Sequence, residues 1–101
     1  MPKRKFATDI HEDKYQCIGV STSHLTSDDK DKLSLTADGE CNMIMERDTG
    51  FFIKLYEETE YTHNLCDNLS QEAQDVIMAC HAAGFRMIEF DCDADELLEY
   101  V

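Results

Sequence analysis

Short apolar runs of strand length alternate with helix-type patterns along this chain, and their order constrains the fold more than any other feature of the sequence. Two of these runs, at 42–46 and 51–56, flank the four residues Arg47-Asp48-Thr49-Gly50. Apolar runs on both sides of a short, glycine-containing link are typical of a β-hairpin. We therefore expect two neighbouring antiparallel strands near the centre of the chain.

A strand and a helix are predicted on each side of this hairpin. Residues 16–22 are apolar and β-branched, as in a buried strand. A short helix is predicted to begin at Thr26 or Ser27, with Asp28 and Asp29 in its first turn, and to end at Leu33 or Leu35. After an acidic connector at 57–68, apolar residues recur at helical spacing over 69–83 and stop before a glycine. Residues 86–92 alternate between apolar and polar, which predicts a half-buried strand.

The resulting order, β-α-β-β-α-β, predicts an α+β domain. We expect an antiparallel sheet with the helices on one face, the split βαβ or ferredoxin-like arrangement. The polar, non-periodic residues 1–14 are predicted to form a flexible arm and 15–101 a single domain. A chain of 101 residues, 43% of them hydrophobic, is large enough to bury one core.

The cysteines and the lack of long apolar runs bear on the cellular setting. Five cysteines, an odd number, without an export signal indicate reduced thiols. The apolar runs are too short to span a membrane. We expect a cytoplasmic protein that needs no cofactor.

Acidic residues are numerous and unevenly distributed. The net charge is −13, and residues 57–101 contain twelve acidic residues against Arg86 alone, whereas 1–27 carry a slight excess of bases. A charge of this size determines partners more than fold, because it repels nucleic acid and attracts basic surfaces, including those that hold nucleic acid. Solubility alone requires less charge.

Part of this acidic region has a regular spacing. Acidic residues alternate from Glu89 to Asp95, and same-face residues of a strand are about 6.6 Å apart, close to two phosphate rises of a nucleic-acid strand. Such a row fits a groove that grips phosphates, although a charged edge strand has the same pattern. The predicted partner-binding surface adds neighbouring acids and tyrosines to the row: Glu57, Glu58, Glu60, Glu89, Asp91, Asp93, Asp95, Glu96, Glu99, Tyr56, Tyr61 and Tyr100.

The candidate metal motifs are incomplete. The Asp-x-Asp-x-Asp run at 91–95 opens like an EF-hand calcium loop, but Glu96 stands where that loop requires glycine. His63 and Cys66 have the spacing of half a zinc site, and no C-x-x-C pair completes it. We predict no metal site, with weak divalent binding by the 91–95 carboxylates left open.

The catalytic motifs are also incomplete. Asp48-Thr49-Gly50 matches the aspartic-protease tripeptide, but its flanks are unlike those of such enzymes, and we interpret it as the hairpin turn. Residues 21–24 place hydroxyl groups beside His24, a potential base. We predict no enzyme, and keep as an alternative a small-ligand-binding or hydrolytic domain using His24 with Asp91. We expect those two residues at opposite edges of the sheet, which counts against the alternative.

Three stretches resemble a small bacterial domain family of unknown function that occurs on plasmids, phages and other mobile elements. Residues 18–26, Ile-Gly-Val-Ser-Thr-Ser-His-Leu-Thr, resemble the family's "ISTAHIT"-like opening. The turn and strand at 48–53 and the helix, glycine and strand at 79–93 are similar to its later pattern. The chain departs from the family where a tryptophan and a proline-containing C-terminal segment are expected. The resemblance implies a genomic setting and no activity.

These observations favour a binding protein. We expect an acidic inhibitor, carried by a mobile element, of a host nucleic-acid-handling defence complex, that is, an anti-CRISPR or anti-restriction protein. Its partner would be a basic protein surface and not nucleic acid itself. An acidic antitoxin against a basic toxin is the remaining alternative.

Overall fold

The computed structural model describes residues 14–39 and 42–96, so the predicted arm at 1–14 lies outside it except for Lys14. The elements in chain order are β1 (Cys17–Ser21), the 3₁₀ helix η1 (Thr22–His24), α1 (Ser27–Asp38), β2 (Ile44–Arg47), β3 (Gly50–Lys54), α2 (Thr59–Cys66), α3 (Gln71–Ala82) and β4 (Met87–Asp91). The α+β class is confirmed, and the predicted order β-α-β-β-α-β is present with one additional helix, α2. Within the described ranges, no helix is both long and apolar enough to cross a membrane.

Helix α2 lies inside the segment predicted as a connector, so that prediction was wrong. Only Thr62 and Cys66 of its eight residues are buried. One polar and one thiol-bearing residue do not produce an apolar stripe, and the helical period is therefore not visible in the sequence.

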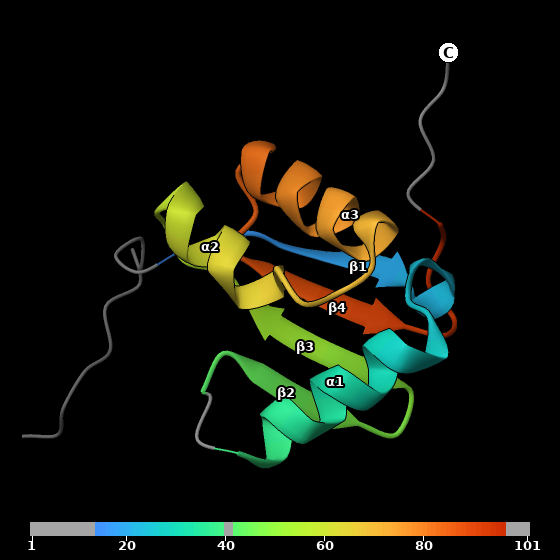
Figure 1. Cartoon of the computed structure of the whole chain (residues 1–101). Helices are drawn as coiled ribbons and strands as arrows, with labels where there is room; N and C mark the ends of the chain where they lie inside the picture. The colour runs from blue at the N-terminus through green and yellow to red at the C-terminus, as the bar shows by residue number, and fades with distance from the viewer. Residues whose placement is uncertain (1–13, 40–41, 97–101) are drawn as a thin grey trace, which may run out of the picture.

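The four strands lie in the order β1-β4-β3-β2 (Figure 1). Strand β3 pairs antiparallel with β4 and with β2, whereas β1 pairs parallel with β4. The sheet is therefore mixed, which corrects the expectation of a wholly antiparallel one, because β4 enters between β1 and β3. Strands β1 and β2 run in the same direction with two strands between them, so α1 joins a split βαβ unit.

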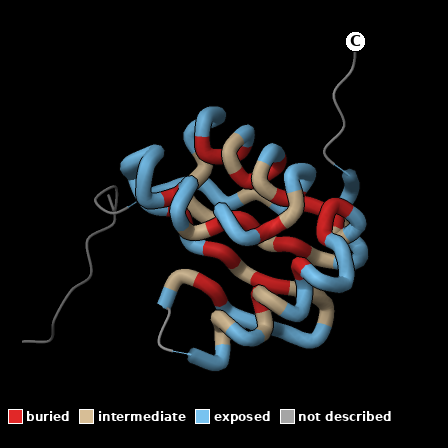
Figure 2. Tube along the Cα trace, in the orientation of Figure 1, coloured by how far each residue is buried: buried red, intermediate tan, exposed pale blue. Residues whose placement is uncertain are grey.

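The hydrophobic core lies on one face of the sheet, between the strands and the helices (Figure 2). Side chains of all four strands enter it, namely Val20, Ile44, Phe51, Ile53, Ile88 and Phe90. The helices contribute Leu33, Cys66, Ala73, Val76, Ile77 and Cys80 to the same cluster. The predicted placement of the helices on one face is confirmed.

The other face of the sheet is open. Its side chains include Met45, Phe52 and Glu89, which are exposed or half-buried. Arg47 forms an ion pair with Glu89 across this face, and its guanidinium lies 5.3 Å from the centre of the Phe52 ring. The charged groups of the open face are thus partly neutralised by one another.

Candidate functional site

The structure divides the predicted partner-binding residues between the two ends of the sheet. Lys54 pairs with Met87 at the end where β3 finishes (the β3 end), and Gly50 pairs with Asp91 at the end where β4 finishes (the β4 end). Tyr56, Glu57, Glu58, Glu60 and Tyr61 follow β3, whereas Glu89, Asp91, Asp93, Asp95 and Glu96 lie on β4 or after it. The predicted residues Glu99 and Tyr100 lie outside the described residues.

The first group forms the tyrosine–glutamate patch, defined as Tyr56, Glu57, Glu58, Glu60 and Tyr61. The two rings meet edge to face, with centroids 5.8 Å apart, and remain 36% and 54% exposed. All three glutamates are exposed, and they make no ion pair with any residue that the structure describes. The patch therefore presents aromatic edges and exposed carboxylates side by side.

Buried polar groups hold the backbone of this patch. Nε2 of the buried His81 lies 3.0 Å from the carbonyl oxygen of Tyr56 and 3.2 Å from that of Glu57. Both partners are acceptors, so Nε2 carries the proton. Thr62, a fully buried residue of α2, also donates a hydrogen bond from its hydroxyl to the Tyr56 carbonyl at 3.0 Å. The patch is thus fixed to both α2 and α3.

The second group does not form the predicted four-residue row. Strand β4 ends at Asp91, whose Oδ1 accepts a hydrogen bond from the Asp93 backbone N–H at 2.9 Å. Aspartate commonly makes this bond to the backbone two residues on, and it turns the chain. Asp95 then folds back and its carbonyl oxygen accepts from the Ser21 N–H at 3.0 Å. The prediction of an extended row through Asp95 was therefore wrong.

This turn brings possible metal ligands together. Donor atoms of Asp91, Cys92 and Asp93 all lie within 4.8 Å of one another. The carboxylates and thiol are largely open to solvent, and one Asp91 oxygen already holds the turn. The geometry allows a weak cation contact and does not enclose one.

His24 follows β1 and lies close to Asp91 in the topology of the sheet. Because β1 and β4 are neighbours and parallel, the segment after β1 follows directly beside Asp91, and the expected placement at opposite edges was wrong. His24 is nevertheless buried, and its Nδ1 lies 3.4 Å from a carboxylate oxygen of Glu72 at the start of α3. His24 does not line the pocket that contains Thr22 and Cys92.

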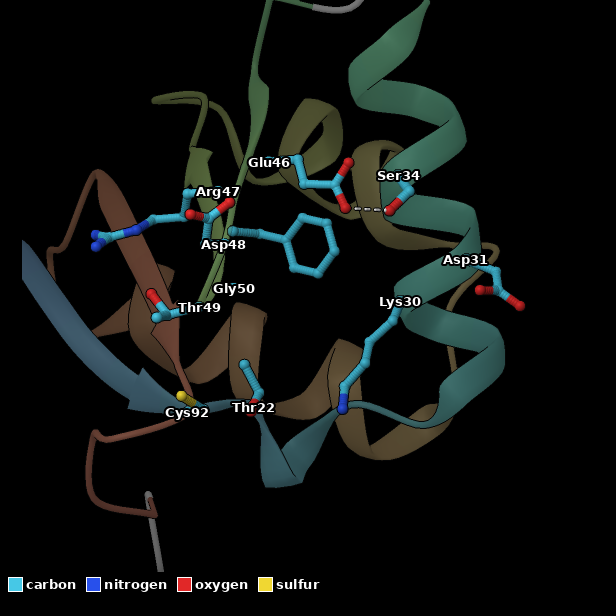
Figure 3. A pocket seen from close by; sticks show the side chains of 11 residues that line it. Thr22, Lys30, Asp31, Ser34, Glu46, Arg47, Asp48, Thr49, Gly50 and Cys92 are labelled. Atoms are coloured by element: carbon cyan, nitrogen blue, oxygen red, sulfur yellow. Dashed lines mark hydrogen bonds between the residues drawn. The ribbon is translucent and has the colours of Figure 1, made fainter.

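A pocket of about 320 Å³ lies at the β4 end, between α1, the β2–β3 turn and the residues after β1 and β4 (Figure 3). It joins parts of the three stretches that carry the family resemblance, because Thr22, Asp48-Thr49-Gly50 and Cys92 all line it. Sequence reasoning missed this pocket. The signal was present in those three motifs, but nothing in the sequence shows that they meet.

Gly50 is what allows the three segments to approach one another. A Cβ atom on Gly50 would lie 1.8 Å from the Phe90 carbonyl oxygen and 3.2 Å from a Thr22 methyl carbon. The Cys92 N–H donates to the Thr49 carbonyl at 3.0 Å in the same place. No side chain fits here, so this contact requires glycine.

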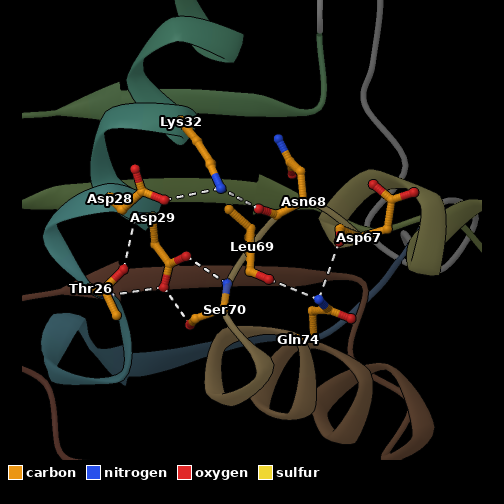
Figure 4. A network of polar contacts seen from close by, with 9 residues as sticks. All are labelled: Thr26, Asp28, Asp29, Lys32, Asp67, Asn68, Leu69, Ser70 and Gln74. Carbon is orange, nitrogen blue, oxygen red and sulfur yellow. Dashed lines mark hydrogen bonds and ion pairs between the residues drawn. The ribbon is translucent and has the colours of Figure 1, made fainter.

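A buried carboxylate links the helices next to this pocket (Figure 4). Asp29 lies in α1 and is only 1% exposed. Its carboxylate accepts hydrogen bonds from the Ser70 N–H at 2.7 Å, the Ser70 hydroxyl at 2.6 Å and the Thr26 N–H at 2.9 Å. Thr26 in turn accepts from the Asp29 N–H, which completes a capping box. Since Ser70 caps α3, one side chain stabilises the N-termini of both helices.

These hydrogen bonds decide the ionisation of Asp29. Burial alone raises the pKa of its carboxyl, but the hydrogen bonds from Ser70 and Thr26 outweigh burial and lower the pKa below the ordinary value. The carboxylate is therefore ionised at neutral pH, where it can accept all three bonds.

At the buried thiols, in contrast to Asp29, the effect of burial on the pKa is the larger one. Burial raises the pKa of Cys66 and of Cys80 to about 11 each, with Asp67 adding to the effect at Cys66. Both thiols stay protonated and fill the core. The Cys17 thiol is exposed, and its pKa is also raised, because it is partly desolvated and lies near the Glu89 carboxylate.

Similarity to a known protein family extends over most of the chain. No curated protein and no solved structure matches the chain. A family model, described as the C-terminal domain of a family of unknown function (DUF5983), matches residues 17–100. That range begins at the first residue of β1 and contains all the elements described above. The chain therefore belongs to this family.

Proposed function

We propose that this domain is an inhibitor that binds the basic nucleic-acid-binding surface of a host defence complex, through the tyrosine–glutamate patch. We further propose that it is carried by a mobile element and acts in the host cytoplasm, as an anti-CRISPR or anti-restriction protein. The observation that carries the proposal is the pair of exposed tyrosines in edge contact, among three glutamates that make no ion pair with the described residues.

This combination suits arginine and lysine side chains. Guanidinium and ammonium groups pair with carboxylates and also lie over aromatic rings. Tyrosine is enriched among the residues that contribute most binding energy in interfaces. The net charge of −13 would speed the encounter with a basic surface, and added salt would slow it.

The acids at the β4 end have a secondary role in this proposal. Glu89 is paired with Arg47, and Asp91 holds a turn, so fewer of their carboxylate oxygens are available to a partner. They would contribute to long-range attraction without making the central contact.

Two variants with equal charge test the proposal. E57Q/E58Q/E60Q and D91N/D93N/D95N each remove three negative charges, so both reduce long-range attraction equally. The experiment measures how each variant competes with nucleic acid for purified RNA-guided and restriction nucleases. We expect the glutamine variant to lose at least about tenfold in affinity, and the asparagine variant at most about threefold.

Other outcomes would reassign the function. Equal losses in both variants would mean that only net charge matters, and the patch would not be a site. A larger loss in the asparagine variant would move the contact to the β4 end. Tight binding to a small basic toxin, with none to nucleases, would make the domain an antitoxin.

A further inference from the structure

The pocket at the β4 end is not part of the proposed interaction surface, and its charges are arranged in a distinctive way. Lys30 extends from α1 along its wall towards Thr22 (Figure 3). It makes no ion pair with the residues of 14–39 or 42–96. An uncompensated ammonium therefore faces a hydroxyl group at one side of the pocket.

A carboxylate lines the other side. Glu46 is held in place by the Ser34 hydroxyl, which donates to its Oε2 at 2.7 Å (Figure 3). Asp48 also lines the pocket, but its carboxylate lies beside Arg47 and apart from that of Glu46. The other charged lining residues are turned away. Arg47 is directed to Glu89 on the open face, and Asp31 points outward from α1.

The frame of the pocket is rigid. The side chain of Phe51 is 5% exposed and anchors the β2–β3 turn in the core. Gly50 lies against the Phe90 backbone, and the Cys92 N–H binds the Thr49 carbonyl. The backbone around the pocket is thus fixed, and Lys30 makes no ion pair with Glu46 or Asp48.

We infer that this pocket binds a small zwitterion, a molecule with an amine at one end and a carboxylate or phosphate at the other. The anionic end is held by Lys30 and the Thr22 hydroxyl, and the amine by Glu46. A volume of about 320 Å³ accepts a molecule of amino-acid size and is at the lower limit of small-molecule sites, roughly 300 Å³. Neither a simple anion nor a simple amine satisfies both sides.

Titration followed by ¹H–¹⁵N spectra tests this inference, with glycine, γ-aminobutyrate and ε-aminocaproate as probes. We expect at least one probe to cause saturable shifts of the Thr22, Lys30, Gly50 and Cys92 amides. Butyrate and butylamine, which each carry one of the two charges, should bind at least about tenfold more weakly. Lys30→Met and Glu46→Gln should each weaken the zwitterion to the same degree, whereas Lys54→Met on the open face should not.

Three results would overturn the inference. One is the absence of saturable shifts with all three zwitterions. Another is binding of butyrate as tight as that of γ-aminobutyrate, which would make the pocket a plain anion site. The third is unchanged binding in Lys30→Met. Because E57Q/E58Q/E60Q leaves the pocket intact, zwitterion binding by that variant separates a failure of this inference from a failure of the proposed function.

Discussion

At the β4 end of the sheet, three chain segments pack closely around Gly50, while at the β3 end, exposed side chains project from a connector and a short helix. Gly50, Phe90 and Thr22 approach so closely that no extra atom fits. The rings of Tyr56 and Tyr61, in contrast, are exposed, while the Tyr56 carbonyl is bonded to Thr62 and His81. Substitutions should therefore be costly for folding at the β4 end and nearly free of cost in the exposed patch, where they should instead change binding.

The largest effect is expected for Gly50→Ala. A Cβ atom 1.8 Å from the Phe90 carbonyl would force the turn away from β4, at a cost on the order of 3–5 kcal/mol in the free energy of unfolding. Urea denaturation measures this loss. Gly39→Ala is the matched control, because its Cβ would lie 3.4 Å from the nearest atom and should cost little. Equal stability of the two variants would contradict the close contact.

Asp29→Asn should have the next largest effect. The amide cannot accept from Ser70 and Thr26 as the carboxylate does, and the loss should be about 2–3 kcal/mol at neutral pH. Because folding lowers the pKa of Asp29, its contribution is fully present above the unfolded pKa of about 3.9 and is lost as the pH falls below it. Asp31→Asn, an exposed change in the same helix, is the control.

The difference between Asp29→Asn and the natural protein should accordingly shrink in acid. Thermal unfolding at a series of pH values measures this. A gap that stays constant down to strongly acidic pH would show that Asp29 acts through packing and not through its charge.

A pair of threonine substitutions compares the two ends directly. The Thr49 hydroxyl is buried with no hydrogen-bond partner among the described residues, whereas that of Thr62 donates to the Tyr56 carbonyl. Thr49→Val should raise stability by about 1 kcal/mol, because it removes an unsatisfied buried group, and Thr62→Val should lower it by about as much. Calorimetry of both variants gives the two signs, and a loss in Thr49→Val would contradict the unsatisfied hydroxyl.

The smallest effect on folding is expected for E57Q/E58Q/E60Q. These side chains are exposed and have no described ion pair, so the stability should change by no more than about 0.5 kcal/mol. Circular dichroism during heating checks this. A large loss of stability would mean that the patch supports the fold, and its binding data would then need a different control.

Local patterns in the sequence were sufficient to predict most of the helices and strands. Helix α3 has Ser70 as its cap and buries Ala73, Val76 and Ile77 as their spacing predicts, and Gly84 follows with a φ of 98°. The hairpin and the last strand were predicted within a few residues. These features depend on neighbours in the chain, so the sequence exposes them directly.

The arrangement of these elements depended on distant contacts. Nothing near Met87 or Cys17 indicates that their strands pair in parallel, because pairing is decided by packing across the whole domain. The acids after Asp91 continue the alternation of a strand, but the Asp91 side chain bonds to the Asp93 backbone and ends it. The pocket was missed because it depends on packing between distant segments. The acidic row was predicted to be too long because the hydrogen bond of Asp91 to the Asp93 backbone is not visible in the sequence.

The position of β4 also has a consequence for synthesis of the protein. Strand β4 lies between β1 and β3 in the sheet, yet it is the last of the four strands to leave the ribosome. Until it emerges, Val20 on β1 and Phe51 on β3 have no strand between them to complete the core. A nascent chain that stops before Met87 therefore exposes apolar strands to chaperones and proteases. Incomplete copies should be removed by quality control, and no partly active fragment should persist.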